Sequence, residues 1–241
     1  MSEQVRAELA PTGVLRAGLN LANFLLISGR DPEGEPTGVA PDMAAEIARR
    51  LGVPVKHVPY KAPGELADAV DTDAWDIGLI GAEPQRAERI AFTPAYVEIE
   101  ATYLVPAGSS IRSLAEVDRP GVRIAVTGRS AYGLWLDRNI AQAALVRTDS
   151  IDSSYERFVG DRLEVLAGLR PRLLADMEKL PGARILDGKF SAVQQAIGTS
   201  RKNAAAVEFL RAFVAETKAS GFVQGLIDKH KVPGLSVAPF A

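Results

Sequence analysis

Short apolar runs typical of strands alternate along this chain with segments of helical periodicity, and the alternation begins twice. In the first round, Met43, Ile47 and Leu51 stand at helical spacing, Gly52 provides a stop, and a strand is expected over 53–58. A strand over 14–17 precedes this helix, and it ends in a loop. Alternating strands and helices favour an α/β fold with a largely parallel sheet.

The order then repeats with a short helix around 65–70 and a strand over 75–80. The strand-like run "VEIEATYLV" is broken by "PAGSS", and "VRIAVTGRSAYGLWLDRNI" restarts a strand, a turn and a helix. A further helix, a strand-like core over 163–166 and another helix follow, and two helices with an apolar stripe end the chain. The restart predicts two lobes, one formed by 1–104 plus 194–241 and the other by 105–193.

Charge and residue usage exclude several kinds of partner and site. The formal net charge is -2 and no run of five Lys or Arg occurs, so we do not expect binding to nucleic acid. The chain has no cysteine, which excludes disulfides, thiolate metal sites and thiol nucleophiles. His57 and His230 stand far apart without metal-ligand spacing, so neither a metal nor another cofactor is expected.

The first residues, "MSEQVRAELAPTG", lack the basic and apolar regions of an export signal, and no run approaches 18 apolar residues. As written, the chain is expected to be cytoplasmic. A second interpretation is a periplasmic protein whose signal was replaced by a start methionine, and the sequence leaves both open.

The stretch "GAEPQRAERIAFTPAY" carries two arginines, Arg86 and Arg89, ahead of a proline-containing segment. Pro84 fixes a turn before them and Pro94 prevents a helix from continuing past Thr93. We therefore expect a loop, one short helical turn and the entry to a strand. Either arginine could lie in solvent, and a guanidinium sheltered from water could instead bind a carboxylate through two parallel donors.

Three stretches resemble the type II periplasmic binding proteins, and within them family 3, which binds polar amino acids and related solutes for ABC importers. They are "GEPTGVAPDMAAEIARRLG", "AWDIGLIGAEPQRAERIAFTPAY" and "IRSLAEVDRPGVRIAVTGRSAYG". The resemblance implies two Rossmann-like lobes joined by a two-strand hinge, with a ligand cleft between them. It also implies that Arg86, six residues before Phe92, binds the ligand's carboxylate, whereas Arg89 faces solvent or a neighbouring carboxylate.

The resemblance assigns ligand contacts in both lobes. In the second lobe, "VTGRSAYG" joins a strand to a helix, so its backbone N–H groups can point at an anion. Thr127 and Ser130 add hydroxyl groups there, Ala131 adds a backbone donor, and Arg129 could hold a second anionic group. In the first lobe the expected contacts are Asn20, Asn23, Phe24, Gly81, Ala82 and Glu83.

The chain also departs from the pattern of that family. Members that bind amino acids hold the ligand's ammonium with an acid at the end of a second-lobe strand, and here that position is Gly168. The usual Tyr-Gly before the returning hinge strand is replaced by Gln194 and Gln195. Glu83 could supply the missing acid, or it could pair with Arg86 or lie in solvent.

Three functions follow from these observations. The first is a monomeric, non-enzymatic binding protein that captures a small carboxylate, either an amino acid, a modified amino acid or an organic acid, for an ABC permease. The second is a cytoplasmic enzyme of dehydratase type on the same fold, with Glu83 as its candidate acid or base. The third is a cytoplasmic ligand sensor.

Overall fold

The computed structural model describes residues 2–240, which form two compact units. The first unit contains the chain up to Glu98 together with the chain from Gln194 onward, and the second contains Ile99–Val193. Two long strands carry the chain from one unit to the other, β7 (Val97–Val105) and β12 (Ser191–Ser200).

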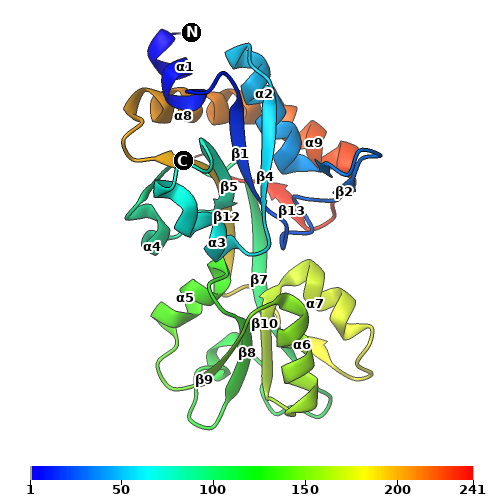
Figure 1. Ribbon diagram of the computed structural model, residues 1–241. Helices are drawn as coiled ribbons and strands as arrows, with labels where there is room; N and C mark the ends of the chain where they lie inside the picture. The colour runs from blue at the N-terminus through cyan, green and yellow to red at the C-terminus, as the bar shows by residue number, and fades with distance from the viewer. Residues whose placement is uncertain (1, 241) are drawn as a thin grey trace. The chain divides into compact units, whose positions relative to one another are not determined.

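The sheet of the first unit has the strand order β4-β1-β5-β12 (Figure 1). β1 (Leu15–Asn20) runs parallel to β4 (Val55–Tyr60) and to β5 (Ile77–Gly81). β12 runs antiparallel to β5 and to the short β6 (Ile90–Phe92). The strand expected over 14–17 is thus longer than predicted, because Leu19 is fully buried and extends the pairing with β4 to Asn20.

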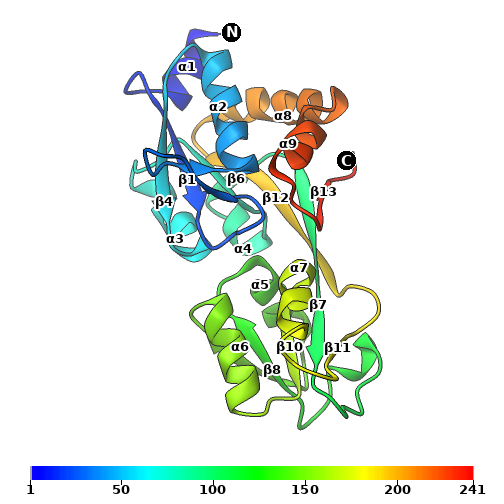
Figure 2. The same cartoon turned by 90° about the vertical axis from the view of Figure 1, so that its right-hand side faces the viewer.

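Helices of the first unit pack on this sheet and on one another. The helix predicted around Met43 is α2 (Val39–Leu51); Met43, Ile47 and Leu51 are buried, and Gly52 ends it in the left-handed conformation at φ 66°. α1 (Glu3–Leu9) packs on α8 (Ala204–Ala219) and α2 packs on α9 (Phe222–His230), and Figure 2 shows α9 next to α8. The shorter elements are β2 (Gly29–Arg30), β3 (Pro36–Thr37), α3 (Pro63–Asp68), α4 (Pro84–Ala87), β13 (Leu235–Val237) and the 3-10 turn at Ala69–Asp71.

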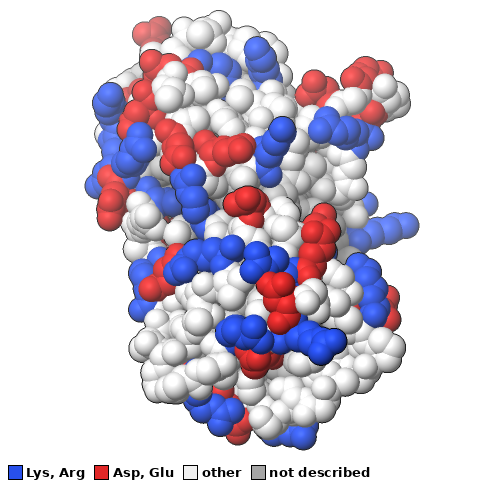
Figure 3. Space-filling model, turned by 60° about the horizontal axis from the view of Figure 1, so that its bottom comes forward, with Lys and Arg blue, Asp and Glu red and all other residues white. Residues whose placement is uncertain are grey.

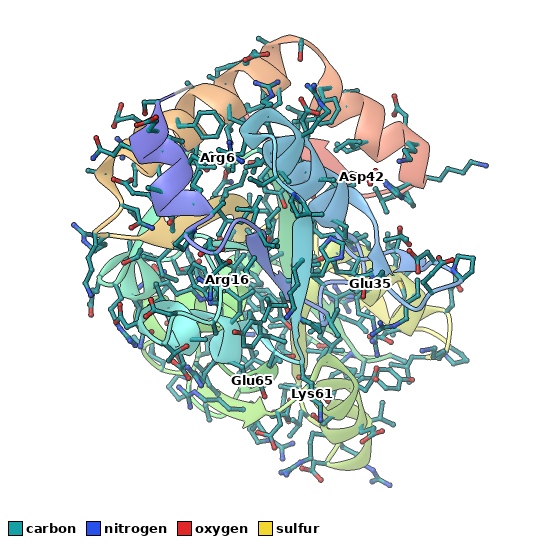
Figure 4. All side chains as sticks on the ribbon, turned by 45° about the horizontal axis from the view of Figure 1, so that its top comes forward. Arg6, Arg16, Glu35, Asp42, Lys61 and Glu65 are labelled. Carbon is teal, nitrogen blue, oxygen red and sulfur yellow. The ribbon has the colours of Figure 1, made fainter. Side chains whose placement is uncertain are left out.

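Ion pairs connect α2 to both C-terminal helices. The guanidinium of Arg50 contacts Glu216 on α8 at 2.8 Å. Asp42, labelled in Figure 4, accepts hydrogen bonds at 2.7 Å from Lys229 and from His230 Nε2 on α9. These pairs attach the last two helices to α2 although the paired residues lie 166 to 188 positions apart in the chain.

The second unit has the strand order β7-β10-β8-β9. β8 (Arg123–Thr127) runs parallel to β10 (Val165–Leu169) and to β9 (Ala144–Thr148), and β10 runs antiparallel to β7. The remaining elements are α5 (Ala131–Asn139), α6 (Ile151–Gly160), α7 (Arg170–Met177), β11 (Arg184–Ile185) and the 3-10 turn at Leu114–Glu116. A core of Leu104, Phe158, Leu166 and Leu173 packs the helices on the sheet.

Both signs of charge are distributed over the surface. On the face drawn in Figure 3, Lys and Arg side chains lie next to Asp and Glu side chains in several places, with uncharged surface between them. None of the helices in residues 2–240 has the length and apolar content needed to cross a membrane.

Candidate functional site

In the first unit, predicted site residues follow the carboxyl ends of two neighbouring parallel strands. Asn20 is the last residue of β1 and Gly81 the last residue of β5. The carboxyl edge of a parallel sheet is where ligands bind in open α/β folds. The side-chain oxygen of Asn20 accepts a hydrogen bond from the backbone N–H of Ala22 at 3.1 Å, which turns the chain away from the sheet.

The loop after β1 is shaped by Asn23. Its side chain is buried, and its oxygen accepts from the backbone N–H groups of Leu25 at 3.2 Å and Leu26 at 3.3 Å. This is a side-chain turn of the kind that Asn favours. It leaves Phe24 at the tip, where the ring is 38% exposed.

Arg86 is a buried arginine on α4, the single helical turn expected from Pro84. It is 6% exposed, and its Nη1 donates to the backbone oxygen of Gly81 at 2.7 Å. Glu83, at the start of α4, is 8% exposed. A charged arginine is rarely buried in a protein unless other groups compensate its desolvation. The burial of Arg86 therefore indicates a specific role for this side chain.

Arg89, by contrast, lies at the surface and forms an ion pair with Asp71 at 2.6 Å. The prediction that it faces solvent or a neighbouring carboxylate is confirmed.

Backbone hydrogen bonds attach the Arg86 segment to β12. The N–H of Ala82 donates to the oxygen of Gln194 at 2.7 Å, and the N–H of Tyr96 donates to Gln195 at 2.9 Å. The side-chain amide of Gln194 donates to Glu98 at 2.8 Å. The segment between β5 and β7 is therefore held in place at both of its ends.

In the second unit, the turn "TGRS" connects β8 to α5. Ser130 caps the helix, because its Oγ accepts from the N–H of Gly133 at 3.0 Å and donates to the oxygen of Thr127 at 2.7 Å. A Cβ at position 133 would lie 2.5 Å from that same oxygen, so the turn requires glycine there. Arg129 adopts the left-handed conformation at φ 57°, and Ala131 is the first residue of the helix.

Thr127 belongs to a buried chain of hydroxyl groups that sequence reasoning missed. Its Oγ1 accepts from Tyr132 Oη at 2.9 Å and lies 2.9 Å from Ser154 Oγ, which lies 2.6 Å from Thr148 Oγ1. Burial raises the pKa of Tyr132, so its phenol stays protonated at neutral pH. These groups come from β8, α5, α6 and β9, so no spacing in the sequence could have brought them together.

At the end of β10, the structure places no acid. Gly168 is buried, and a Cβ on it would meet Leu173 Cδ2 at 3.0 Å. The strand ends one residue later at Leu169, which precedes α7 without forming a side-chain cap. The next charged residue, Arg170, donates to Glu100 at 2.7 Å.

The tryptophans and histidines lie elsewhere. Trp75 is 4% exposed and donates to Leu66 in the core of the first unit, and the Trp135 ring lies 5.2 Å from that of Phe190. His57 contacts Glu35 at 3.0 Å, and His230 contacts Asp42. Within residues 2–240, no three His, Cys, Asp or Glu side chains are grouped as a metal site would need.

Comparison with known proteins places the chain among solute-binding proteins. Residues 22–232 match the family model described as bacterial extracellular solute-binding proteins, family 3. The L-cystine-binding protein TcyJ of Escherichia coli is 24% identical over 221 residues, which cover 90% of this chain and 82% of that protein.

Solved structures share the fold. The solute receptor for L-cysteine of Neisseria gonorrhoeae has a TM-score of 0.76 at 19% identity, covering 97% of this chain and 95% of that one. The ancestral amino acid-binding protein AncCDT-1, a precursor of cyclohexadienyl dehydratase, has a TM-score of 0.73 at 21% identity, covering 92% and 97%. The predicted fold class, that of the two-lobed type II periplasmic binding proteins, is confirmed.

Proposed function

The chain belongs to the bacterial extracellular solute-binding proteins of family 3, and from this membership we propose that it captures a small carboxylate-bearing ligand for an ABC importer. Its relatives are named for cystine, cysteine or amino acids in general. Under this proposal the protein acts outside the cytoplasm, and an importer's permease is its partner.

The burial of Arg86 carries the proposal. A guanidinium has five N–H donors in one plane, and the bond to Gly81 fixes one of its nitrogens, Nη1, at the carboxyl end of β5. A carboxylate suits such a group because it accepts two parallel hydrogen bonds and neutralises the charge. Asn20, Phe24 and Glu83 are the first-unit residues proposed to surround the ligand with Arg86.

In the second unit, the start of α5 is proposed to bind an anionic group. Helix N-termini present backbone N–H groups and a partial positive charge, both of which favour an anion. Ser130 and Thr127 hold this turn in a fixed shape, and Arg129 adds a positive charge beside it.

Calorimetry with two arginine variants tests the proposal. A thermal-shift screen of amino acids and small organic acids first identifies a ligand. Arg86→Ala should then weaken its binding by about 10-fold to 150-fold, since a charge-assisted hydrogen bond contributes about 1.5–3 kcal/mol. Arg89→Ala, in the next turn and already paired with Asp71, is the matched control and should change binding less than about threefold. Equal losses in both variants would show that Arg86 is not the carboxylate anchor.

One observation favours an enzyme as the second candidate. Glu83 is a carboxylate only 8% exposed, on the same turn as Arg86, and acid–base catalysis needs such a group within reach of a substrate. If the ligand recovered after incubation with the protein is chemically unchanged by NMR, the binding function holds. Conversion of the ligand that stops in Glu83→Gln would support the enzyme.

A further inference from the structure

The second unit contains a cavity whose lining includes none of the residues predicted to contact the ligand. Its volume is about 390 Å³, and most of its lining is apolar, with Phe158 and Val159 from α6 and with Leu180, Pro181 and Ala183 from the segment before β11. Pro106 and Ala107, which follow β7, also line it. The volume lies within the range of about 300–1,000 Å³ that is usual for small-molecule sites.

Fixed backbone contacts hold the walls of this cavity together. β11 pairs with β7, with Arg184 opposite Val105. The guanidinium of Arg184 also donates to the backbone oxygens of Ser109 and Ile111. Gly182 approaches Ala107 so closely that a Cβ on it would lie 2.9 Å from the Ala107 Cβ. These contacts connect the segments that line the cavity.

Arg162 lines this cavity and also a larger one of about 880 Å³. Its backbone is in the left-handed conformation at φ 50°, which is uncommon for a residue with a side chain. Its backbone oxygen accepts from Arg123 at 2.8 Å, yet its guanidinium has no hydrogen bond or ion pair within residues 2–240. Neighbouring arginines differ, since Arg123 pairs with Glu164 at 2.8 Å and Arg157 pairs with Asp161 at 2.5 Å.

We propose that this cavity binds a small amphipathic monocarboxylate, with its hydrocarbon chain among the apolar residues and its carboxylate on Arg162. Apolar walls favour a hydrocarbon chain because its burial removes apolar surface from water. Arg162 is the one charged residue that lines the apolar cavity, and among the residues described its guanidinium has no acid to neutralise it. Charge complementarity therefore favours an anion over an alcohol or an amine. This site is independent of Arg86 and of the proposed transport function.

Octanoate is the probe for the test, titrated into the full chain by calorimetry and by 15N-resolved NMR. We expect saturable binding, with shifted amide signals confined to the segments around 106–107, 158–163 and 180–183. Arg162→Gln should weaken binding about threefold to tenfold, because the ion pair lies at the surface. Val159→Asp should weaken it further by placing a like charge beside the carboxylate; Val159 is 43% exposed, so this change should not disturb folding.

Two controls make the result decisive. Arg157→Gln removes an arginine on α6 that is already paired with Asp161, and it should leave octanoate binding unchanged. Arg86→Ala should also leave it unchanged. Saturable binding that needs Arg162 but not Arg86 supports the site. The proposal is overturned if octanoate fails to bind, if Arg86→Ala abolishes its binding, or if octanol binds as tightly and Arg162→Gln has no effect.

Discussion

Gly38 allows the loop after β1 to pack closely against the start of α2. It precedes the helix at φ 144°, and a Cβ on it would lie 2.3 Å from the backbone oxygen of Leu26. Gly38→Ala should lower the free energy of unfolding by about 2–4 kcal/mol, through both backbone strain and this clash. Urea denaturation followed by tryptophan fluorescence measures the loss.

Gly52→Ala is the matched control for this prediction. Gly52 also has a positive φ, 66°, but a Cβ there would meet nothing within 4 Å. Its replacement should therefore cost only the conformational penalty, about 1 kcal/mol. Similar losses in the two variants would show that the clash with Leu26 relaxes and contributes little.

The sequence predicts the position of a residue best where its immediate neighbours in the chain determine it. Pro84 and Pro94 confined the Arg86 segment to one helical turn, and the surface ion pair of Arg89 agrees with its expected exposure. The hydroxyl chain from Tyr132 through Thr127 to Ser154 could not be predicted. Thr127 and Ser154 lie 27 residues apart and meet only because α6 packs across β8.

Among helices, α2 depends on a charged cluster centred on Glu46. Hydrogen bonds from Arg49 and, to a lesser extent, from Arg50 lower the pKa of Glu46 to about 2, against the opposing effect of its partial burial. A carboxyl group with a lowered pKa stabilises the folded state above its unfolded value of 4.5. This stabilisation is lost as the pH falls from 4.5 to about 2.

Glu46→Gln should therefore lower the free energy of unfolding by about 1–2 kcal/mol at pH 7, and the difference from the wild type should narrow below pH 4.5. Urea denaturation at several pH values measures it. Glu208→Gln is the control, because Glu208 is 75% exposed and its pairing with Arg211 should contribute less than about 0.5 kcal/mol. A difference that stays constant down to pH 2 would contradict the charged role of Glu46.

Elements with strong periodicity were predicted from the sequence, and weakly marked ones were not. α2 and the two C-terminal helices show apolar residues at helical spacing, and β7 contains β-branched and aromatic residues. β9, with the sequence ALVRT, was missed because it is a half-exposed edge strand with little apolar signal. α1 was missed because only Val5 and Leu9 of its seven residues are buried.

At the scale of the whole molecule, the second round of strands and helices predicted a second lobe. The resemblance to type II periplasmic binding proteins predicted how the two lobes are joined. The sequence could not indicate which strands are neighbours. β12 lies next to β5 although more than 100 residues separate them, and this pairing places Gln195 opposite Gly81. Long-range pairing of this kind depends on packing of the whole core rather than on local pattern.

Under the proposed function, the class of ligand depends on which charged groups the protein offers to it. Neither Gly168 nor Leu169 offers an acid where relatives that bind amino acids are expected to hold the ammonium. Burying an alkylammonium without an acceptor costs several kcal/mol, even after the protein relaxes. Organic acids and N-modified amino acids should therefore bind more tightly than free amino acids in a competition screen.

Glu83 could reverse the preference for organic acids over free amino acids by binding the ammonium group. The variant Glu83→Gln tests whether it does. If Glu83 supplies the missing charge, free amino acids bind, and Glu83→Gln should weaken them about 10-fold or more while binding of organic acids changes little. Glu88→Gln, an exposed carboxylate on the following turn, is the control and should have no effect. Submicromolar binding of a common amino acid that survives Glu83→Gln would contradict both outcomes. The ammonium would then have an acceptor other than Glu83 and other than the end of β10.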